Sequence, residues 1–389
     1  MLQRKSSFQL LEGGYLFPEI EKRKVALLAK EPEAKIISLG IGDTTLPLAP
    51  HISSALAKAG TEMGTAEGYH GYGPAKGDPL LRKKIAETVY AGKINPDDIF
   101  VTDGSKCDIA RLQMLLADSE AIAIQDPAYP VYADTTIMTG KKLHLIPCTP
   151  ANNFFPKAEQ LPNASVLILC SPNNPTGAAA THEQLQELVD WALKNGALLI
   201  FDAAYAAFIQ DKNLPRSIFE IEGAEKVAIE LNSFSKSAGF TGIRLGWTVV
   251  PETVVYKDGI PIKKDWERLL NTCFNGASRL SQAGAFAALD SNNSVKENIL
   301  AYLKNAERIR ECLHGLGIET YGGKHIPYIW ANFPGKSSWE IFDLILRKCH
   351  VVTTPGAGFG KAGEGFIRFS GFALPEHVEH ACKRLAGVF

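Results

Sequence analysis

The chain has 389 residues, and its 41 Lys and Arg against 42 Asp and Glu give a net charge of −1. A hydrophobic content of 46% with this balance excludes an intrinsically disordered chain and argues against a nucleic-acid-binding face, which is normally basic. The seven cysteines have no metal-binding spacing and no apolar run is long enough to cross a membrane, so we expect a cytoplasmic protein with reduced thiols, no metal site and no membrane partner.

Short apolar runs alternate with helical patterns along most of the chain. Continuous apolar runs of this length are typical of strands in a parallel sheet that helices cover on both faces. The runs that we expect to form strands are residues 121–125, 143–147, 166–170, 197–201, 227–231 and 243–250. The alternation of these runs with helices predicts an α/β fold.

A helix is expected between the third and fourth of these strands. Thr181 can cap its N-terminus with Gln184 as the capping-box partner, and Gly196 can end it. The apolar residues of one face are Leu185, Leu188, Val189, Ala192 and Leu193. Beyond the sheet, a helical pattern over residues 281–316 leads to strand candidates at 328–333, 350–353 and 365–370, which predicts a smaller α+β domain at the end of the chain.

A polar segment at residues 231–247 follows one of the expected buried strands. Its glycines and serines predict a turn that brings Ser233, Ser235, Lys236 and Arg244 to the carboxyl end of the sheet, where α/β folds bind ligands. Hydroxyls and a guanidinium suit a phosphate group, because Arg forms charge-assisted hydrogen bonds to oxyanions. The lysine could be a further phosphate donor or a nucleophile, and the whole segment could also be an ordinary polar loop.

Two further polar segments are expected at the same edge of the sheet. Asn174 follows the strand at 166–170, and Asp202 follows the strand at 197–201. A carboxylate at the end of an apolar run needs a cationic or N–H partner. With the lysine segment, these positions resemble the class I and II aminotransferases, a family of fold-type I enzymes that use pyridoxal 5'-phosphate.

The resemblance assigns roles to individual residues. Lys236 matches the lysine that forms a Schiff base with the cofactor, Asp202 the partner of the ring nitrogen, and Tyr205 a donor to the ring oxygen, and these three are the expected catalytic residues. The cofactor-binding residues that it implies are Tyr72, Ser105, Lys106, Tyr129, Asn174, Asp202, Tyr205, Ser233, Ser235, Lys236 and Arg244. Tyr72 matches a tyrosine that reaches the cofactor phosphate of a neighbouring subunit, so the resemblance also implies a homodimer with shared active sites.

The resemblance also implies the architecture of the chain. In this family a large domain with a mainly parallel seven-stranded sheet binds the cofactor, and a small α+β domain packs beside it. We expect the large domain at residues 46–285 and the small domain at 286–389. Residues 1–45 would form an N-terminal arm and part of the small domain.

A more specific similarity extends over nearly the whole chain to the LL-diaminopimelate aminotransferases. The segments that carry it are residues 14–20, 40–45, 171–178, 239–247, 274–278 and 354–356. Members of that group make LL-diaminopimelate from tetrahydrodipicolinate with glutamate as amino donor, on the route to lysine and peptidoglycan. The residues that this similarity places against substrate are Tyr15, Gly42, Lys106, Tyr129, Asn174, Asn275 and Arg368, with Arg368 on the α-carboxylate.

One position departs from this group. Two residues past Gly73 the group commonly carries an acidic side chain that helps to hold the distal ammonium of the substrate, but this chain has Ala75. Glu67, in the segment that precedes this loop, could substitute. The alternatives are therefore transamination of another amino acid, such as lysine or an aromatic one, or a β-elimination. A sensor domain of a transcription regulator shares the fold, but the fold-bearing sequence begins within the first fifteen residues, so we expect an enzyme.

A glycine-rich segment at residues 358–363 satisfies the GxGxxG pattern of dinucleotide-binding proteins. That pattern binds a pyrophosphate only where a strand leads through the glycines into a helix. Here a further strand is expected after the glycines, so the segment is interpreted as a turn, and a hydride-transferring enzyme is not favoured.

Overall fold

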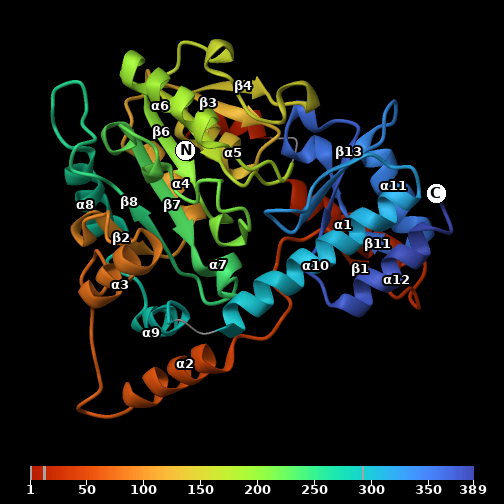
Figure 1. Cartoon of the computed structure of the whole chain (residues 1–389), viewed down its shortest axis with the longest axis horizontal. Helices are drawn as coiled ribbons and strands as arrows, with labels where there is room; N and C mark the ends of the chain where they lie inside the picture. The colour runs from red at the N-terminus through yellow and green to blue at the C-terminus, as the bar shows by residue number, and fades with distance from the viewer. Residues whose placement is uncertain (1, 12–14, 291–292) are drawn as a thin grey trace.

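A seven-stranded sheet forms the centre of the computed structural model, which describes residues 2–11, 15–290 and 293–389 (Figure 1). The strands lie in the order β2-β8-β7-β6-β5-β3-β4, and β8 runs antiparallel to both of its neighbours while the other pairs are parallel. Their bounds are β2 Ile99–Thr102, β3 Ala121–Asp126, β4 Lys142–Pro147, β5 Val166–Cys170, β6 Leu198–Asp202, β7 Ala228–Ser233 and β8 Gly246–Val249. The prediction of a mainly parallel seven-stranded sheet is confirmed.

Helices cover both faces of this sheet. On one face, residues of α4, α5 and α8 share a buried core with alternate residues of β5 such as Val166 and Ile168. On the other face, residues of α6 share a second core with Leu167 and Leu169. Successive residues of a strand point to opposite faces, and helices cover both faces, so both sets of side chains are buried. The helices around the sheet are α2 Pro50–Glu62, α3 Pro79–Val89, α4 Ser105–Met114, α5 Val131–Thr139, α6 His182–Asn195, α7 Phe234–Ser237, α8 Ile262–Cys273 and α9 Arg279–Ala288.

The best-marked helix of the sequence, α6, begins and ends where its caps predict. Thr181 and Gln184 form the capping box, and Gly196 ends the helix in the left-handed conformation with φ of 59°. The predicted face is buried at Leu185, Leu188, Val189 and Ala192, but Leu193 is 42% exposed, so it lies at the edge of that face.

Two details of the sheet differ from the expectation. The apolar run at 243–250 forms a strand only from Gly246, because Arg244 has a positive φ of 66° that breaks the extended backbone before it. The edge strand β2 has no counterpart among the expected strands. It pairs with β8 alone, over four residue pairs, and its length gives little periodic signal.

The C-terminal elements form a second unit with its own core. Its antiparallel sheet has the order β12-β13-β10-β9, with bounds β9 Thr320–Gly322, β10 Tyr328–Asn332, β12 Thr354–Pro355 and β13 Phe366–Ser370. Around it lie α10 Asn293–Gly315, α11 Ser338–Cys349 and α12 Pro375–Leu385, and Figure 1 shows α10 running from the large sheet to this unit. The helical pattern at 281–316 thus belongs to two helices, α9 and α10, and residues 291–292 between them lie outside the described residues.

The N-terminal region packs with this second unit. Strand β1 (Ile37–Ser38) pairs in parallel with β11 (Val351–Val352), and α1 (Leu16–Leu28) buries Leu16, Ile20 and Leu27 in the same core. The expected strand at 350–353 therefore forms, but it pairs with β1 and not with the sheet of β10 and β13. The domain boundaries near residues 45 and 285 stay a prediction.

The glycine-rich segment at 358–363 is a turn, as predicted. It spans two short 3-10 helices and leads into β13, so no helix follows the glycines. Ala128 N donates to Phe359 O over 2.9 Å, which holds the turn against the end of β3.

The 3-10 helices of the described residues are η1 Ser6–Leu11, η2 Pro96–Asp98, η3 Pro150–Asn152, η4 Ala158–Gln160, η5 Ala206–Phe208, η6 Ile218–Glu220, η7 Ala224–Lys226, η8 Gly356–Phe359 and η9 Lys361–Gly363. Within the described ranges, no helix is both long and apolar enough to cross a membrane.

Candidate active site

A cavity of about 540 Å³ lies at the carboxyl ends of β5, β6 and β7. Side chains from the C-terminal unit close its other side, among them Tyr328 and Arg368. Most of the predicted site residues line it: Gly42, Ser105, Lys106, Tyr129, Asn174, Asp202, Tyr205, Ser233, Ser235, Lys236, Arg244 and Arg368. The parallel register explains this gathering, because the ends of neighbouring parallel strands meet at one edge of a sheet.

Asp202, the last residue of β6, is a buried carboxylate without a basic partner among the described residues. Its Oδ2 accepts a hydrogen bond from Tyr132 Oη over 2.7 Å, and its Oδ1 accepts one from Ala204 N over 3.0 Å. Burial raises the pKa of Asp202 above its usual range, and these two bonds oppose the rise. A protonated nitrogen of a ligand would supply the positive charge that this site lacks.

Arg368 is the reverse case, a guanidinium that is 1% exposed and has no acidic partner among the described residues. It comes from β13, and it donates to Asn174 Oδ1 over 2.6 Å and to Gly40 O over 2.5 Å. Its Nε is buried without a hydrogen-bond partner, and the Tyr328 ring lies 4.2 Å from its Cζ. A buried guanidinium with free donors is a binding group for a carboxylate.

Lys236 lies on the short helix α7 and lines the same cavity as these two charges. Its Nζ donates to the backbone oxygen of Gly42. Burial lowers the pKa of Lys236 to about 8, with the nearby cations Arg368 and Arg244 acting in the same direction and Asp43 opposing them. A lysine with a lowered pKa has a larger share of the neutral amine, which is the form that acts as nucleophile or base.

Hydroxyls, backbone N–H groups and a guanidinium converge at another end of the cavity. Ser235 Oγ accepts from Arg244 Nη1 over 3.2 Å, and Ser233 Oγ caps α7 through Ser235 N. Helix α4 begins at Ser105 beside them, after Gly104, and the first turn of a helix leaves its N–H groups without intrahelical acceptors. Gly104 is needed here because a Cβ would lie 3.0 Å from Arg244 Nη2 at a positive φ of 118°. This end of the cavity suits an anion.

Aromatic rings line the cavity near Lys106. Tyr129 packs edge-to-face with Tyr132, their ring centroids 5.9 Å apart. Tyr15 does not line the cavity itself, but its ring centroid lies 5.6 Å from Lys106 Nζ, and burial next to Tyr129 raises its pKa. Gly14, which begins one of the matching segments, lies outside the described residues.

Besides Tyr15, two further predicted residues do not line this cavity. Tyr72 is 91% exposed and Asn275 is also exposed. The two loops that carry them touch, because a Cβ on Gly276 would lie 3.0 Å from Pro74 O. The structure thus brings Tyr72 and Asn275 to one shared surface, away from the cavity of their own chain.

Some residues of the site were not expected from the sequence. Tyr132 bonds Asp202, and Tyr328 Oη lies 3.0 Å from Tyr205 Oη. Asp43 lines the cavity near Lys236. Tyr132 lies in the first turn of α5, three residues after the predicted Tyr129, and no sequence pattern pointed to Tyr328.

Comparison with known proteins agrees with this geometry. The family described as aminotransferase class I and II matches residues 34–385. The chain is 49% identical to LL-diaminopimelate aminotransferase, chloroplastic, of Arabidopsis thaliana, over 100% of this chain and 87% of that protein. It is 46% identical to LL-diaminopimelate aminotransferase of Protochlamydia amoebophila, over 99% of this chain and 97% of that one.

A solved structure is similar over the same length. L,L-diaminopimelate aminotransferase from Chlamydomonas reinhardtii superposes with a TM-score of 0.95 at 48% identity, covering 99% of this chain and 98% of that chain. Thermus thermophilus aspartate aminotransferase, a double mutant, has a TM-score of 0.86 at 20% identity, which shows the common fold. The chain therefore belongs to the class I and II aminotransferases and, within them, to the LL-diaminopimelate aminotransferase group.

Proposed function

We propose that this chain is a pyridoxal 5'-phosphate-dependent aminotransferase that interconverts LL-2,6-diaminopimelate and 2-oxoglutarate with tetrahydrodipicolinate, L-glutamate and water. The observation that carries this proposal is the pair of unmatched charges in one cavity, with Lys236 beside them. Asp202 lacks a basic partner and Arg368 lacks an acidic one among the described residues. A protonated ring nitrogen and an amino-acid carboxylate are the partners that fit.

The donor set fits pyridoxal 5'-phosphate along its whole length. Asp202 would hold the ring nitrogen protonated, Tyr129 would stack on the ring, and Asn174 and Tyr205 would bind its oxygen. The phosphate would lie at the start of α4, held by the residues Ser105, Ser233, Ser235 and Arg244. When bound, the cofactor supplies an electron sink for the pair released as the substrate Cα–H bond breaks.

The residues of the chain divide the remaining work between them. Arg368 binds the α-carboxylate of the amino acid and thereby fixes the direction of its Cα–H bond. Lys236 Nζ takes the proton from Cα, for which its pKa of about 8 provides a neutral amine near neutral pH. Asp202 would stay ionised as the partner of the ring nitrogen, supported by the hydroxyl of Tyr132.

The far end of the cavity is where the substrate class is decided. Lys106, beside the Tyr15 ring, is placed to bind a second carboxylate. Diaminopimelate also carries a second ammonium, and Ala75 lies in a half-buried turn where the related enzymes commonly have an acid. This absence favours, as a second candidate, transamination of a different amino acid or a β-elimination on the same cofactor.

Donor preference tests the proposal. The purified protein is supplied with pyridoxal 5'-phosphate and 2-oxoglutarate, and glutamate formation is measured with LL-diaminopimelate, lysine, aspartate and aromatic amino acids as donors. LL-diaminopimelate should give the highest kcat/KM by a wide margin. A higher value for any other donor would select the second candidate, and release of ammonia without glutamate would select the β-elimination.

We infer in addition that the enzyme is a homodimer in which Tyr72 and Asn275 enter the active site of the partner. Their exposure, their common surface and their distance from the cavity of their own chain support this arrangement. Mixing two inactive variants, Lys236→Ala and Tyr72→Ala, tests it. Hybrid dimers would have one intact site and regain activity, whereas independent sites would leave the mixture as inactive as either variant.

For the location we propose the cytoplasm. The seven cysteines are all unpaired thiols, which is typical of a reducing compartment. Fractionation of the source cells with an antibody to this chain tests it, and recovery in another compartment would contradict it.

A further inference from the structure

A buried ionic network lies behind the first turn of α4, on the side away from the cavity. Asp108 is fully buried within this helix. Its Oδ2 accepts hydrogen bonds from Thr102 Oγ1 and from Thr248 Oγ1, each over 2.6 Å, and its Oδ1 accepts one from Arg111 Nη1 over 3.0 Å. Since Thr102 ends β2 and Thr248 lies in β8, this one carboxylate ties the helix to two strands.

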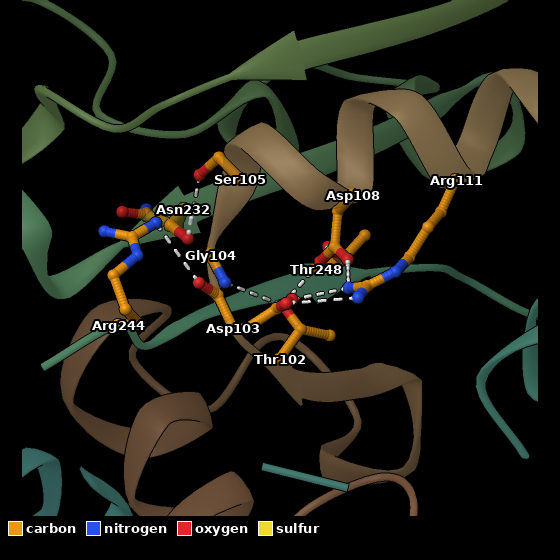
Figure 2. Close-up of polar contacts among 9 residues, drawn as sticks. All are labelled: Thr102, Asp103, Gly104, Ser105, Asp108, Arg111, Asn232, Arg244 and Thr248. Atoms are coloured by element: carbon orange, nitrogen blue, oxygen red, sulfur yellow. Dashed lines mark hydrogen bonds and ion pairs between the residues drawn. The ribbon is translucent and has the colours of Figure 1, made fainter. Parts of the chain in front are cut away.

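The network continues from Arg111 to Asp103, which lies just before the N-cap Gly104 of the helix. Arg111 donates to both carboxylate oxygens of Asp103, with Nη1 to Oδ1 at 2.5 Å and Nη2 to Oδ2 at 3.1 Å. The backbone oxygen of Asp103 in turn accepts a bond from Arg244 Nη2 over 3.3 Å. Figure 2 shows Arg111 and Arg244 reaching the Asp103 turn from opposite sides. Hence a chain of polar contacts runs from the buried Asp108 to a cation of the cavity.

The turn between these residues makes further hydrogen bonds and packs closely against β8. Gly104 N donates to Thr102 Oγ1 over 3.4 Å, and Ser105 Oγ donates to Asn232 O over 3.2 Å. A Cβ on Gly246 would lie 2.9 Å from the Cα of Gly104, so β8 packs directly against the turn. The turn is therefore held by β8 on one side and by the start of α4, which Asp108 anchors, on the other.

Each charged side chain of the network has an oppositely charged partner within it, with Arg111 shared by two carboxylates. Burial raises the pKa of Asp108 to about 6, and the two threonines and Arg111 oppose the rise, so the carboxylate is ionised at neutral pH. Arg111 lies between two carboxylates, which raise its pKa. Loss of Arg111 would leave the buried Asp108 without a cationic partner, and loss of Asp108 would leave Arg111 with Asp103 alone. A buried charge that loses a partner shifts position or recruits water.

We propose that Asp108 and Arg111 are positioning residues for the phosphate end of the cofactor. They hold residues 102–105 and, through Asp103, the guanidinium of Arg244, in the arrangement where all donors converge on one anion. This rests on the proposed function, because it assumes a cofactor that carries a phosphate. Neither side chain lines the cavity, so neither touches the cofactor.

The experiment compares two forms of the cofactor on apoenzyme. Dissociation constants for pyridoxal 5'-phosphate and for pyridoxal, which lacks the phosphate, are measured by absorbance and equilibrium dialysis for the wild type, Asp108→Asn and Arg111→Gln. Each variant should bind pyridoxal 5'-phosphate about tenfold or more weakly, the effect of losing a hydrogen bond to a charged group. Pyridoxal should bind as it does to the wild type, and turnover at saturating cofactor should stay close to the wild-type value.

A matched control lies at the opposite end of β2. Asp98 forms a largely buried ion pair with Lys263 over 2.7 Å, and neither residue lines the cavity. Asp98→Asn should destabilise the apoenzyme towards heat without changing either dissociation constant. If Asp98→Asn weakens the binding of pyridoxal 5'-phosphate as much as Asp108→Asn does, the effect is general destabilisation and the proposal is wrong.

Other outcomes are equally decisive. Equal weakening of both cofactor forms, or no weakening of either, would overturn the positioning role. Should Asp108→Asn fail to fold, Thr248→Val decides, since it keeps the side-chain shape and removes one of the three donors to Asp108. Thr248→Val should weaken the binding of pyridoxal 5'-phosphate several-fold and leave the binding of pyridoxal unchanged. A wild type that binds neither form would instead refute the proposed function, so the two failures are distinguishable.

Discussion

Two buried carboxylates of the large sheet domain, Asp202 and Asp108, show how the chain uses charge. Asp202 receives only a tyrosine hydroxyl and a backbone N–H, and it faces the cavity. Asp108 receives two threonine hydroxyls and the guanidinium of Arg111, and it lies outside the cavity lining. The first anion is left for a cation that a ligand brings, whereas the second is neutralised within the chain and holds structure.

The arginines repeat the contrast. Arg368 donates to an amide and a backbone oxygen, so its charge is unmatched by any carboxylate in the part of the chain described here. Arg111 donates to two carboxylates. A net charge of −1 for the whole chain therefore hides a cavity with unmatched charges beside a network with matched ones. Substitutions in the two regions should fail in different ways.

The largest effect on activity is expected at Lys236, which lines the same cavity as the unmatched charges of Asp202 and Arg368. Lys236→Ala removes both the amine that attaches the cofactor and the base that takes the Cα proton, so kcat should fall at least about 10³-fold. Mass spectrometry after borohydride reduction checks it: the wild-type chain should gain the mass of the reduced cofactor and the variant should not. Cofactor fixed to the variant at another lysine would show that the lysine has been misassigned.

The contrast between the two carboxylates is tested directly by matched substitutions. Asp202→Asn removes the charge that faces the ligand, so kcat should fall about 10²-fold or more even at saturating cofactor. Asp108→Asn makes the same chemical change and should leave kcat at saturating cofactor close to the wild-type value. Steady-state kinetics over a range of cofactor concentrations separates the two, and equal losses of kcat would break the distinction between them.

Much of this site could be predicted from the sequence, because each catalytic residue follows a strand that local pattern reveals. Asp202 ends one buried apolar strand, and Asn174 and Lys236 lie in the loop and the short helix that follow two others. The pairing of Arg368 with Asn174 could not be predicted, since it joins positions 194 residues apart across two units. The network of Asp108 could not be predicted either, because Thr102 comes from the edge strand β2, whose four residues give little periodic signal.

A smaller effect is expected at Tyr132, the hydroxyl donor to Asp202. Tyr132→Phe keeps the ring that packs against Tyr129 and removes one hydrogen bond to a buried charge, which should lower kcat about tenfold. The loss of this bond should also raise the pKa of Asp202, so activity should decline at a higher pH on the acid side than in the wild type. The pH profile of kcat checks this. If the acid side of the pH profile does not shift, Tyr132 supports Asp202 sterically and not electrostatically.

The smallest effect on activity is expected at Glu230, a third buried carboxylate that limits how far the contrast extends. Like Asp202 it accepts only neutral donors: Tyr90 Oη over 2.7 Å, Ser217 Oγ over 2.5 Å and Ile218 N over 3.0 Å. Unlike Asp202 it does not line the cavity, so no ligand can bring it a cation. An unmatched charge thus signals a binding role only where it faces a cavity.

The cost of Glu230 should appear in stability. Burial raises its pKa to about 7, so the folded chain holds this proton more tightly than the unfolded chain does, and the free energy of unfolding should fall as the pH rises from about 4.5 to about 7. Glu230→Gln should remove this decline, worth at most about 3 kcal/mol, and leave kcat unchanged. Denaturant unfolding across this pH range checks it, with the exposed Glu222→Gln as control. If the decline in stability persists in Glu230→Gln, other titrating groups cause it. A fall in kcat would show that a charge outside the cavity affects the reaction.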